Sequence, residues 1–361
     1  MVIGIIGGGQ LARMLALAGY PLGLKFIVLE PAADACAAPV AEQLRGDYDD
    51  ETLLAELASR CDVVTYEFEN VPARAVELLI GKVPVYPPPE ALATAQDRLF
   101  EKTLCRDLGI ATAPFAPVNS LQELQDAMTT IGYPAILKTR REGYDGKGQV
   151  VLRNRDDLSK AWKQLRGVAA IVEGFVAFDR EISVIAARSV SGELKVYDLA
   201  ENIHKDGILR LSQARENDPL QAKARQIVGD LMDKLEYVGV IGLELFQCGD
   251  ELIVNEFAPR VHNSGHWTQN GALTCQFENH LRAILNWPLG ATDLKGRAAM
   301  VNLIGDMPVS QDVLRHSHAH LHDYGKEPRA GRKLGHINLC ASDETLYAEQ
   351  LQALRKLAGE I

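Results

Sequence analysis

The chain has 361 residues, of which 47% are hydrophobic, and its formal net charge at pH 7 is -10. At about 150 residues per domain, this length predicts two or three domains with substantial cores. The acidic balance argues against a nucleic-acid partner, because such a surface needs a basic face. No apolar run approaches the roughly 20 residues of a membrane span. No secretory leader pattern precedes the first apolar run, and the six cysteines form no C-x-x-C pair. We therefore expect a cytoplasmic protein without a membrane partner.

The first 90 residues alternate apolar strands with amphipathic helices, from VIGIIG at residues 2–7 to VPVYP at residues 83–87. This alternation predicts a doubly wound parallel sheet. The proline run that begins at Pro87 predicts the end of this domain.

A glycine turn follows the first strand. Gly7, Gly9 and Ala12 fit the G-x-G-x-x-G/A pattern of a dinucleotide site, and Glu30 ends the second strand, where such a site binds ribose. A lone fingerprint of this kind is a weak signal. A nicotinamide dehydrogenase is therefore one alternative among several.

The rest of the chain mixes helices with many strands. A long helical pattern covers residues 90–110, two strands flank the glycine-rich segment 142–149, and a strongly β region begins near residue 169. A helix is expected at about 217–235, and short strands with a last helix follow residue 290. The fold class is therefore α/β combined with α+β.

The segment VIGLELFQCGDELIVNEF, residues 240–257, predicts a β-hairpin. If the turn is centred at Asp250, Glu244 lies directly across from Glu256 on one face. Facing carboxylates in apolar strands repel each other, and a divalent cation is the natural compensation. Oxygen ligands of this kind suit Mg²⁺, which takes the rest of its ligands from water and phosphates. Two solvated edge residues are the alternative interpretation.

The segment EGYDGKGQ, residues 142–149, is a candidate phosphate cradle. Its glycines let backbone N–H groups approach an anion closely, and Lys147 adds charge. The pair Asp145-Gly146 is also typical of a type I′ hairpin turn. Both interpretations are compatible, because a hairpin tip can close over a nucleotide.

Nearby cations leave two interpretations open. Lys138 ends the apolar run PAILK, which fits a snorkelling side chain as well as a phosphate ligand. Arg98 and Lys102 lie four residues apart on one helix face, which suits a solvated face or an anion clamp.

The segment NEFAPRVHNSGHWTQNG, residues 255–271, packs many polar side chains into an irregular stretch after the hairpin. Loops held by a rigid hairpin often carry catalytic residues. Arg260 offers a planar fork for a small oxyanion such as bicarbonate, and His262 and Asn263 offer further donors.

Two C-terminal motifs are notable. RHSHAHLH is expected to place His316, His318, His320 and His322 on one strand face, but no acidic or cysteine ligand with zinc-site spacing accompanies them. GKEPRAGRKLGH is the most basic cluster of the acidic chain, which suits a phosphorylated substrate.

Together, these motifs resemble the ATP-grasp carboxylate–amine ligases. The marks are DRLFEKTLCRDLGIATAP, the strand that ends at Lys138, GYDGKGQ, VEGFV followed by REISV, and the paired glutamates. Within this superfamily, GIIGGGQLARM, TYEFENV, NEFAPRVHNSGHWT and GKEPRAGRKLGH are similar to the 5-(carboxyamino)imidazole ribonucleotide synthases of purine biosynthesis. The resemblance implies an ATP-grasp fold with a Rossmann-like pre-ATP-grasp domain at 1–90, an ATP-grasp domain at 91–290 with a lid at about 112–173, and a small C-terminal domain at 291–361.

The resemblance also implies the site residues. Glu244 and Glu256, with Asn255 beside them, would hold Mg²⁺, while Arg260, His262 and Asn263 would surround bicarbonate and carboxyphosphate, and Asp145 and Lys147 would act in catalysis, Asp145 as the base. The ATP ligands would be Arg98, Lys138, Gly143, Tyr144, Asp145, Gly146, Lys147, Gly148, Gln149, Glu173, Gly174, Phe175, Val176, Glu181, His204, Asn255 and Glu256. The acceptor ribotide would contact Gly8, Gly9, Gln10, Leu11, Glu67 or Glu69, Tyr144, Lys326, Arg332 and Lys333.

The implied reaction is an ATP-dependent carboxylation. Bicarbonate would attack the γ-phosphoryl group of Mg-ATP, and the exocyclic amine of 5-aminoimidazole ribonucleotide would take up the carboxyl group, directly or through trapped CO₂. The N-terminal glycine turn would then face the acceptor rather than a dinucleotide, since a helix N-terminus binds a phosphate of either molecule. The resemblance suggests a homodimer. Alternatives are the dehydrogenase, a non-catalytic nucleotide-binding scaffold, and another ATP-grasp ligase that uses formate or carboxylates biotin.

Overall fold

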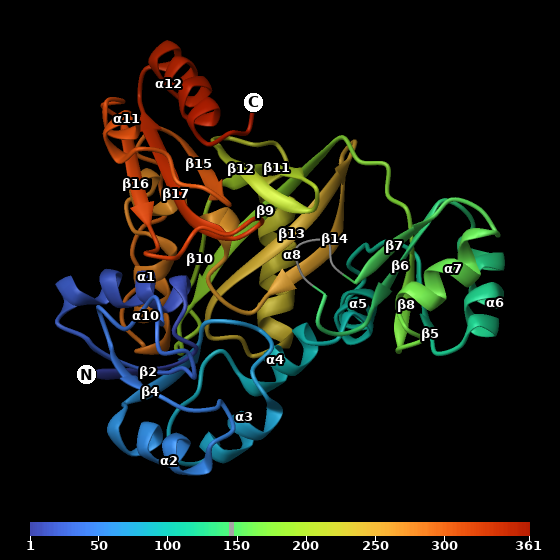
Figure 1. The fold of residues 1–361 in the computed structure, drawn as a ribbon, viewed down its shortest axis with the longest axis horizontal. Helices are drawn as coiled ribbons and strands as arrows, with labels where there is room; N and C mark the ends of the chain where they lie inside the picture. The colour runs from blue at the N-terminus through green and yellow to red at the C-terminus, as the bar shows by residue number, and fades with distance from the viewer. Residues whose placement is uncertain (144–147) are drawn as a thin grey trace.

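The computed structural model describes residues 1–143 and 148–361. Figure 1 shows an α/β layer at the N-terminus, a large central sheet, an arm that projects to one side, and strands and helices at the C-terminus. Within the described ranges, no helix is long and apolar enough to cross a membrane.

The N-terminal layer is a parallel sheet with the strand order β3-β2-β1-β4. Ile3 and Ile5 pack on the face that carries α1, and Ile6 packs on the opposite face with α2 and α3, so the sheet is covered on both sides as predicted. The elements are β1 Val2–Ile6, α1 Gln10–Gly19, η1 Tyr20–Leu22, β2 Lys25–Leu29, β3 Glu42–Leu44, α2 Glu51–Arg60, β4 Val63–Tyr66 and α3 Ala73–Leu79.

The strand expected at residues 83–87 is reduced to a single bridge between Val64 and Val85. Prolines at 84 and from 87 onward lack the N–H groups that a ladder needs. The expected long helix at 90–110 is also wrong. It divides into α4 Pro89–Ala95 and α5 Arg98–Asp107, because Asp97 caps α5 by accepting a hydrogen bond from the Leu99 N–H at 3.0 Å.

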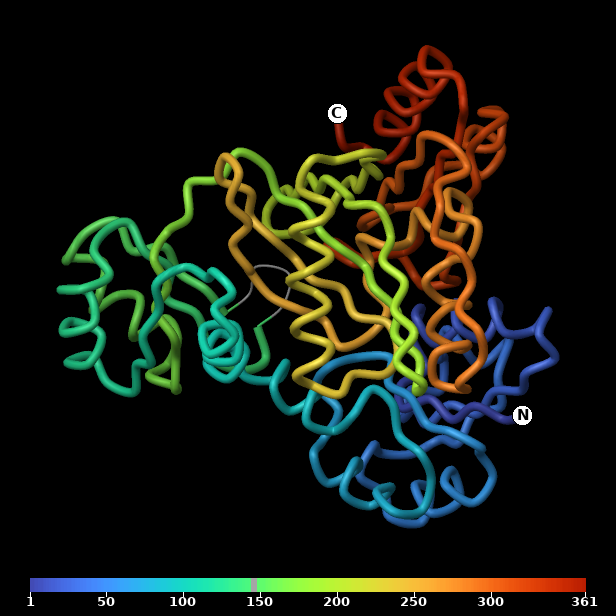
Figure 2. Tube along the Cα trace, turned by 180° about the vertical axis from the view of Figure 1, so that it is seen from behind, coloured from blue at the N-terminus to red at the C-terminus, as the bar shows by residue number. Residues whose placement is uncertain are grey.

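The arm is an antiparallel sheet with the strand order β5-β8-β6-β7, packed against α6 and α7 around its own apolar cluster. Figures 1 and 2 both show the arm projecting from the central sheet. Its elements are β5 Phe115–Val118, α6 Leu121–Ile131, β6 Ala135–Thr139, β7 Gln149–Leu152, α7 Asp157–Gln164 and β8 Ala170–Gly174. The strands predicted on both sides of residues 142–149 are β6 and β7, and they pair.

The central sheet has the order β14-β13-β9-β11-β12-β15-β17-β16, and β10 pairs with β9. The C-terminal strands extend this sheet, because β15 pairs with β12. Its strands are β9 Arg180–Arg188, β10 Leu194–Val196, β11 Leu199–Lys205, β12 Ile208–Arg215, β13 Gly239–Cys248, β14 Glu251–Ala258, β15 Arg297–Ile304, β16 Ala319–Asp323 and β17 Lys333–Ala341. The helices are α8 Gln221–Lys234, η2 Asn263–Gly265, α9 Thr268–Gly271, α10 Gln276–Ile284, α11 Ser310–Leu314 and α12 Glu344–Leu357.

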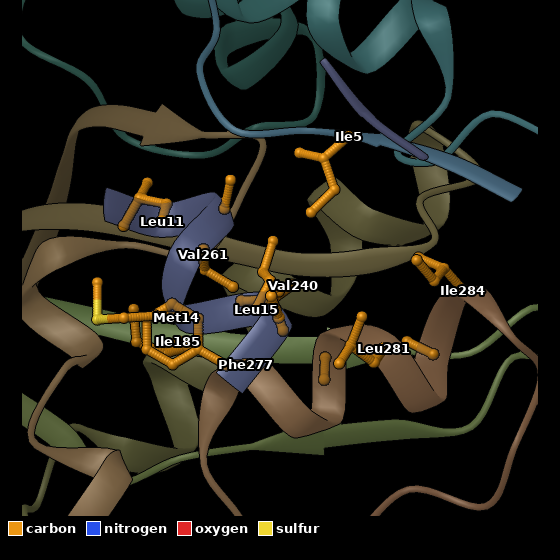
Figure 3. Close-up of a cluster of buried hydrophobic side chains, with 14 of the residues drawn as sticks. Ile5, Leu11, Met14, Leu15, Ile185, Val240, Val261, Phe277, Leu281 and Ile284 are labelled. Carbon is orange, nitrogen blue, oxygen red and sulfur yellow. The ribbon is translucent and has the colours of Figure 1, made fainter. Parts of the chain in front are cut away.

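Apolar packing fixes α1 on the central sheet. Figure 3 shows side chains of α1 next to those of α10, β9 and β13. This packing holds the N-terminus of α1, with the glycine turn before it, beside the central sheet. The labelled residues of this cluster are Ile5, Leu11, Met14, Leu15, Ile185, Val240, Val261, Phe277, Leu281 and Ile284.

Candidate active site

A cavity of about 520 Å³ lies where the N-terminal layer, the arm, the central sheet and the C-terminal strands meet. Segments far apart in sequence contribute to its wall, so the fold brings most of the predicted residues together. The predicted residues in this wall are Gln10, Leu11, Glu67, Glu69, Arg98, Lys138, Gly143, Gln149, Glu181, His204, Glu244, Asn255, Glu256, Arg260, His262, Asn263 and Lys333.

Some predicted residues lie elsewhere. Tyr144, Asp145, Gly146 and Lys147 are outside the described residues. Within the described ranges, the predicted residues not found in the cavity wall are Gly8, Gly9, Gly148, Glu173, Gly174, Phe175, Val176, Lys326 and Arg332.

The carboxylates of the hairpin face each other as predicted, since Glu244 pairs with Glu256 across β13 and β14. The assumed turn centre at Asp250 is wrong, because Cys248 pairs with Glu251 around a two-residue turn. A register shift next to Glu244 restores the expected pairing. This shift is a β-bulge in which β14 carries an extra residue.

The bulge changes which side chains reach the cavity. Asn255 and Glu256 are both partly exposed and line the cavity, whereas Val254 and Phe257 on either side are buried. In a regular strand, consecutive side chains point to opposite faces, and a bulge re-aims them. Glu244 therefore meets an Asn-Glu pair instead of a single carboxylate.

Helix α5 holds the bulge through Glu101 and Lys102. The Lys102 ammonium is 1% exposed and donates to the carbonyl oxygens of Val254 at 2.9 Å and Asn255 at 2.6 Å. The Glu101 carboxylate accepts from the N–H of Phe257. The solvated-face interpretation of Lys102 is wrong, because this lysine is buried and satisfies backbone carbonyls.

The two carboxylates of the pair have different pKa values. Although burial opposes it, the Arg98 guanidinium, 2.8 Å from Glu256, lowers the pKa of Glu256. Burial and then the charge of Glu256 raise the pKa of Glu244. A cation between the carboxylates would remove this conflict, and two carboxylates with an amide oxygen are a donor set that Mg²⁺ accepts.

Apolar side chains form part of the cavity wall. The rings of Phe178 and Phe246 stack with 4.7 Å between centroids, and Ile136 and Leu209 line the same cavity. Sequence reasoning missed these residues. The signal was present at Phe246, which follows Glu244 by two positions and so shares its face of the strand.

Charged side chains also line this cavity. The Lys138 ammonium is 7% exposed and lies 3.0 Å from the buried Glu173 carboxylate, so it does not snorkel to solvent. Although burial opposes it, Lys102 and Lys138 lower the pKa of Glu173. The side chains of Glu181 and His204 contact each other at the cavity wall.

Arg260 and His262 lie next to the carboxylate pair. Arg260 donates from Nε to Glu69 at 2.5 Å, and His262 Nε2 lies 3.6 Å from Glu244 Oε1. Burial, reinforced by Arg260, lowers the pKa of His262 to about 3, so its ring is neutral near pH 7.

The backbone N–H groups of the N-terminal glycine turn donate hydrogen bonds to acidic side chains. Glu67 accepts from the N–H groups of Gly9 and, at 3.4 Å, Ala12. Glu30 accepts from the Gly8 N–H at 2.9 Å and from the Tyr48 hydroxyl at 2.7 Å. Burial raises the pKa of Glu67 to about 7.

At the N-terminus of α1, Lys326 Nζ donates to Gln10 Oε1 at 2.5 Å. Burial lowers the pKa of Lys326. The histidine motif does not lie on one strand face as expected, because only His320 and His322 of its four histidines fall in β16, while His316 and His318 precede it. Within the described ranges, no cluster of three or more histidine, cysteine or acidic residues forms a metal centre.

Comparison with known proteins covers nearly the whole chain. Residues 1–96 match the ribonucleotide synthetase preATP-grasp domain, 103–277 the ATP-grasp domain, and 298–350 the phosphoribosylaminoimidazole carboxylase C-terminal domain. The N5-carboxyaminoimidazole ribonucleotide synthase of Pseudomonas aeruginosa is 52% identical over 349 residues, 96% of this chain and 97% of that protein. The crystal structure of the Thermus thermophilus synthetase superposes with a TM-score of 0.96 at 51% identity, covering 99% of both chains. The synthase of Aspergillus clavatus, in complex with ADP and 5-aminoimidazole ribonucleotide, has a TM-score of 0.92 at 29% identity and covers 100% of this chain and 99% of that one.

The fold, the carboxylate pair and the matching domains define an ATP-grasp ligase. At this identity over nearly the full length, the chain belongs to the family of N5-carboxyaminoimidazole ribonucleotide synthases. The fold and family expected from the sequence motifs are confirmed. The dehydrogenase and the non-catalytic scaffold are therefore set aside.

Proposed function

We propose that the chain carboxylates the exocyclic amine of 5-aminoimidazole ribonucleotide, using ATP and bicarbonate, and releases ADP and phosphate. The observation that carries this proposal is that one cavity holds the Glu244–Glu256 pair, the Arg260–His262 pair and the residues at the N-terminus of α1. Family membership supports the same reaction.

The apolar part of the cavity wall suits the adenine ring, which stacks well on aromatic side chains such as Phe178 and Phe246. The Glu173 side chain is paired with Lys138. We therefore propose that residues 173–176 bind adenine through their backbone. Glu181 and His204 are proposed to hold the ribose side of the nucleotide. Arg98, Lys138 and residues 143–149 are proposed to hold the phosphates, with Tyr144, Asp145, Gly146 and Lys147 outside the described residues.

The residues on β13 and β14 fit a magnesium ion. Glu244 and Glu256 would hold it, with Asn255 beside them, because these oxygen donors lie together on the paired strands. When bound, Mg²⁺ supplies charge neutralisation for the phosphate oxygens of the nucleotide. Arg98 would then exchange part of its pairing with Glu256 for the phosphates.

Arg260, His262 and Asn263 are proposed to bind bicarbonate beside the γ-phosphate. A bicarbonate oxygen forms a bond to the γ-phosphorus, the bond from that phosphorus to the bridging oxygen breaks, and ADP leaves. These side chains contribute by positioning and by stabilising oxyanion charge. Closure of the arm would exclude water from the labile carboxyphosphate.

The amine of the ribotide then attacks the carboxyl carbon, or CO₂ released from it, and the bond to the phosphate oxygen breaks. We propose Asp145 as the base that takes the amine proton, and we also propose a catalytic role for Lys147; both residues are outside the described residues. Lys326, Arg332 and Lys333 are proposed to bind the ribotide phosphate, and Gly9, Gln10 and Leu11 to face the ribotide. Glu67 is the better candidate for the ribose, since Glu69 is already paired with Arg260.

We also propose the domain limits 1–90, 91–290 and 291–361, with the lid at 112–173, and that the protein works as a cytoplasmic homodimer.

ADP release tests the proposed function. We expect release to require both bicarbonate and 5-aminoimidazole ribonucleotide, and its rate to fall to background when either is omitted. Release that ignores the ribotide, or that requires formate instead of bicarbonate, would assign the chain to another ATP-grasp reaction.

A further inference from the structure

Gln276, the first residue of α10, holds the backbone of His262 through two hydrogen bonds. The His262 N–H donates to Gln276 Oε1 at 2.9 Å, and Gln276 Nε2 donates to the His262 carbonyl at 2.7 Å. The same nitrogen lies 3.1 Å from His266 Nδ1. Gln276 has no exposed surface, so it cannot touch a substrate in the cavity.

Glycines make room for this contact on both sides. A Cβ atom at Gly265 would lie 2.7 Å from Gln276 Oε1, and one at Gly242 would lie 2.5 Å from the Cβ of His262. Neither glycine has a positive φ angle. Their missing side chains therefore serve close approach rather than an unusual backbone conformation.

Ser264 fixes which ring nitrogen of His262 carries the proton, and the Gln276 contacts hold the backbone of the same segment. Nδ1 accepts from the Ser264 N–H at 3.4 Å and lies 2.8 Å from Ser264 Oγ. A nitrogen that accepts a backbone N–H carries no proton, so the neutral ring has its proton on Nε2. Nε2 lies on the cavity side, 3.6 Å from Glu244 Oε1.

We propose that Gln276 is a positioning residue for the ligase reaction. It holds the backbone of His262 so that the Nε2–H donates to the oxyanion formed from bicarbonate. The inference rests on the proposed function and assigns to Gln276 a role exerted through His262. Misplacing a positioned donor by about 1 Å costs up to about 100-fold in rate.

The first test compares Gln276→Glu with Gln276→Leu. Glutamate keeps the acceptor for the His262 N–H and loses the donor to its carbonyl, whereas leucine loses both. We expect kcat/KM for bicarbonate to fall by between about 10-fold and 100-fold, while KM for ATP changes by less than about twofold. If Gln276→Leu does not fold, Gln276→Glu carries the test.

Gln221 offers a matched control. Its side chain also makes two hydrogen bonds to a backbone: it accepts from the Leu199 N–H at 2.8 Å and donates to the Tyr197 carbonyl at 3.1 Å. None of these residues lines the cavity. We expect Gln221→Leu to leave kcat/KM for bicarbonate within about twofold of the wild type. An equal loss in both variants would mean that Gln276 is merely structural.

The second test combines Gln276→Glu with His262→Ala. If Gln276 acts through His262, the double variant is hardly slower than His262→Ala alone. Losses that multiply would overturn the proposal.

Side-chain ¹⁵N spectra of histidine-labelled protein give a readout independent of turnover. We expect His262 as the Nε2–H tautomer in the wild type and a mixture of tautomers in Gln276→Glu. An unchanged tautomer would contradict the positioning role, whereas wild-type protein inactive with bicarbonate and the ribotide would contradict the proposed function instead.

Discussion

The carboxylate of Glu256 has two cationic partners, Arg98 and the proposed magnesium ion. In the structure it pairs with Arg98 at 2.8 Å, and in the proposed complex it also faces a magnesium ion. Both interactions favour the charged form, because each places positive charge beside the carboxylate. Glu256 is therefore charged near pH 7, as a ligand of a cation must be.

The substitution Glu256→Gln is expected to lower kcat by about 100-fold or more, because the amide cannot supply the negative charge. The measurement is ADP release with all substrates present, together with a thermal melt to show that the fold persists. Glu251→Gln, an exposed change on the same strand, is the control and should leave the rate unchanged. A Glu256→Gln enzyme that turns over at nearly the wild-type rate would refute the metal assignment.

At the residue scale, the sequence predicts the charged residues of the site better than its apolar contacts. The predicted pairing of Glu244 with Glu256 was correct only because the bulge offsets the misplaced turn. The stacking of Phe178 on Phe246 joins the segment before β9 to β13, and no local pattern reports contacts between such distant segments.

Among the elements, the bulge in β14 depends on a lysine from another segment. Lys102 carries a buried charge that meets the Val254 and Asn255 carbonyls and lies 3.7 Å from Glu173. Removing one partner of such a group leaves the others buried and unpaired.

Lys102→Met is therefore expected to lower the free energy of unfolding by about 3 kcal/mol. It should also weaken nucleotide binding, because the bulge no longer aims Asn255 and Glu256. Urea unfolding and calorimetric titration with ATP and Mg²⁺ measure the two effects. Lys223, which donates to the Asp250 carbonyl at the exposed end of the same hairpin, gives the control: Lys223→Met should change stability by no more than about 0.5 kcal/mol. Equal losses in the two variants would contradict the role given to Lys102.

The sequence could not reveal the bulge or the break between α4 and α5. Asp97 reads as an ordinary helix residue until Arg140 of the distant arm pairs with it at 2.6 Å. The pairing predicted for the hairpin was right although its turn was misplaced, because the bulge shifts the register by one residue.

At the scale of the whole molecule, His280 of α10 connects the N-terminal layer to the central sheet. Its Nε2 lies 2.8 Å from Thr65 Oγ1 in β4, and its Nδ1 accepts from the Val240 N–H of β13 at 3.1 Å. One ring thereby bridges the N-terminal layer and the central sheet. Burial lowers the pKa of His280 to about 4, so the folded protein keeps it neutral.

This shift makes stability depend on pH. Because the pKa is lower in the folded state, the contribution of His280 is fully present above its ordinary pKa of about 6.5 and is lost as pH falls through about 4. The difference corresponds to about 3 kcal/mol. We expect His280→Gln to be less stable than the wild type at pH 7.5 and to lose much of that deficit at pH 4.5, as measured by urea unfolding. A deficit that stays constant across this range would contradict the assignment.

The parallel N-terminal layer and the β-rich centre could be predicted from periodicity and glycine placement. The continuation of the central sheet through β15, β17 and β16 could not, because strand order depends on pairings between distant segments. Local motifs therefore carry enough information to predict the family, whereas the arrangement of its parts depends on long-range pairings.

Oxygen transfer from bicarbonate tests the central claim most directly. With ¹⁸O-labelled bicarbonate, ATP and 5-aminoimidazole ribonucleotide, attack on the γ-phosphorus carries one labelled oxygen into the phosphate released. We predict that mass spectrometry of this phosphate shows one ¹⁸O atom per molecule turned over. Unlabelled phosphate, with its new oxygen taken from water, would contradict the account.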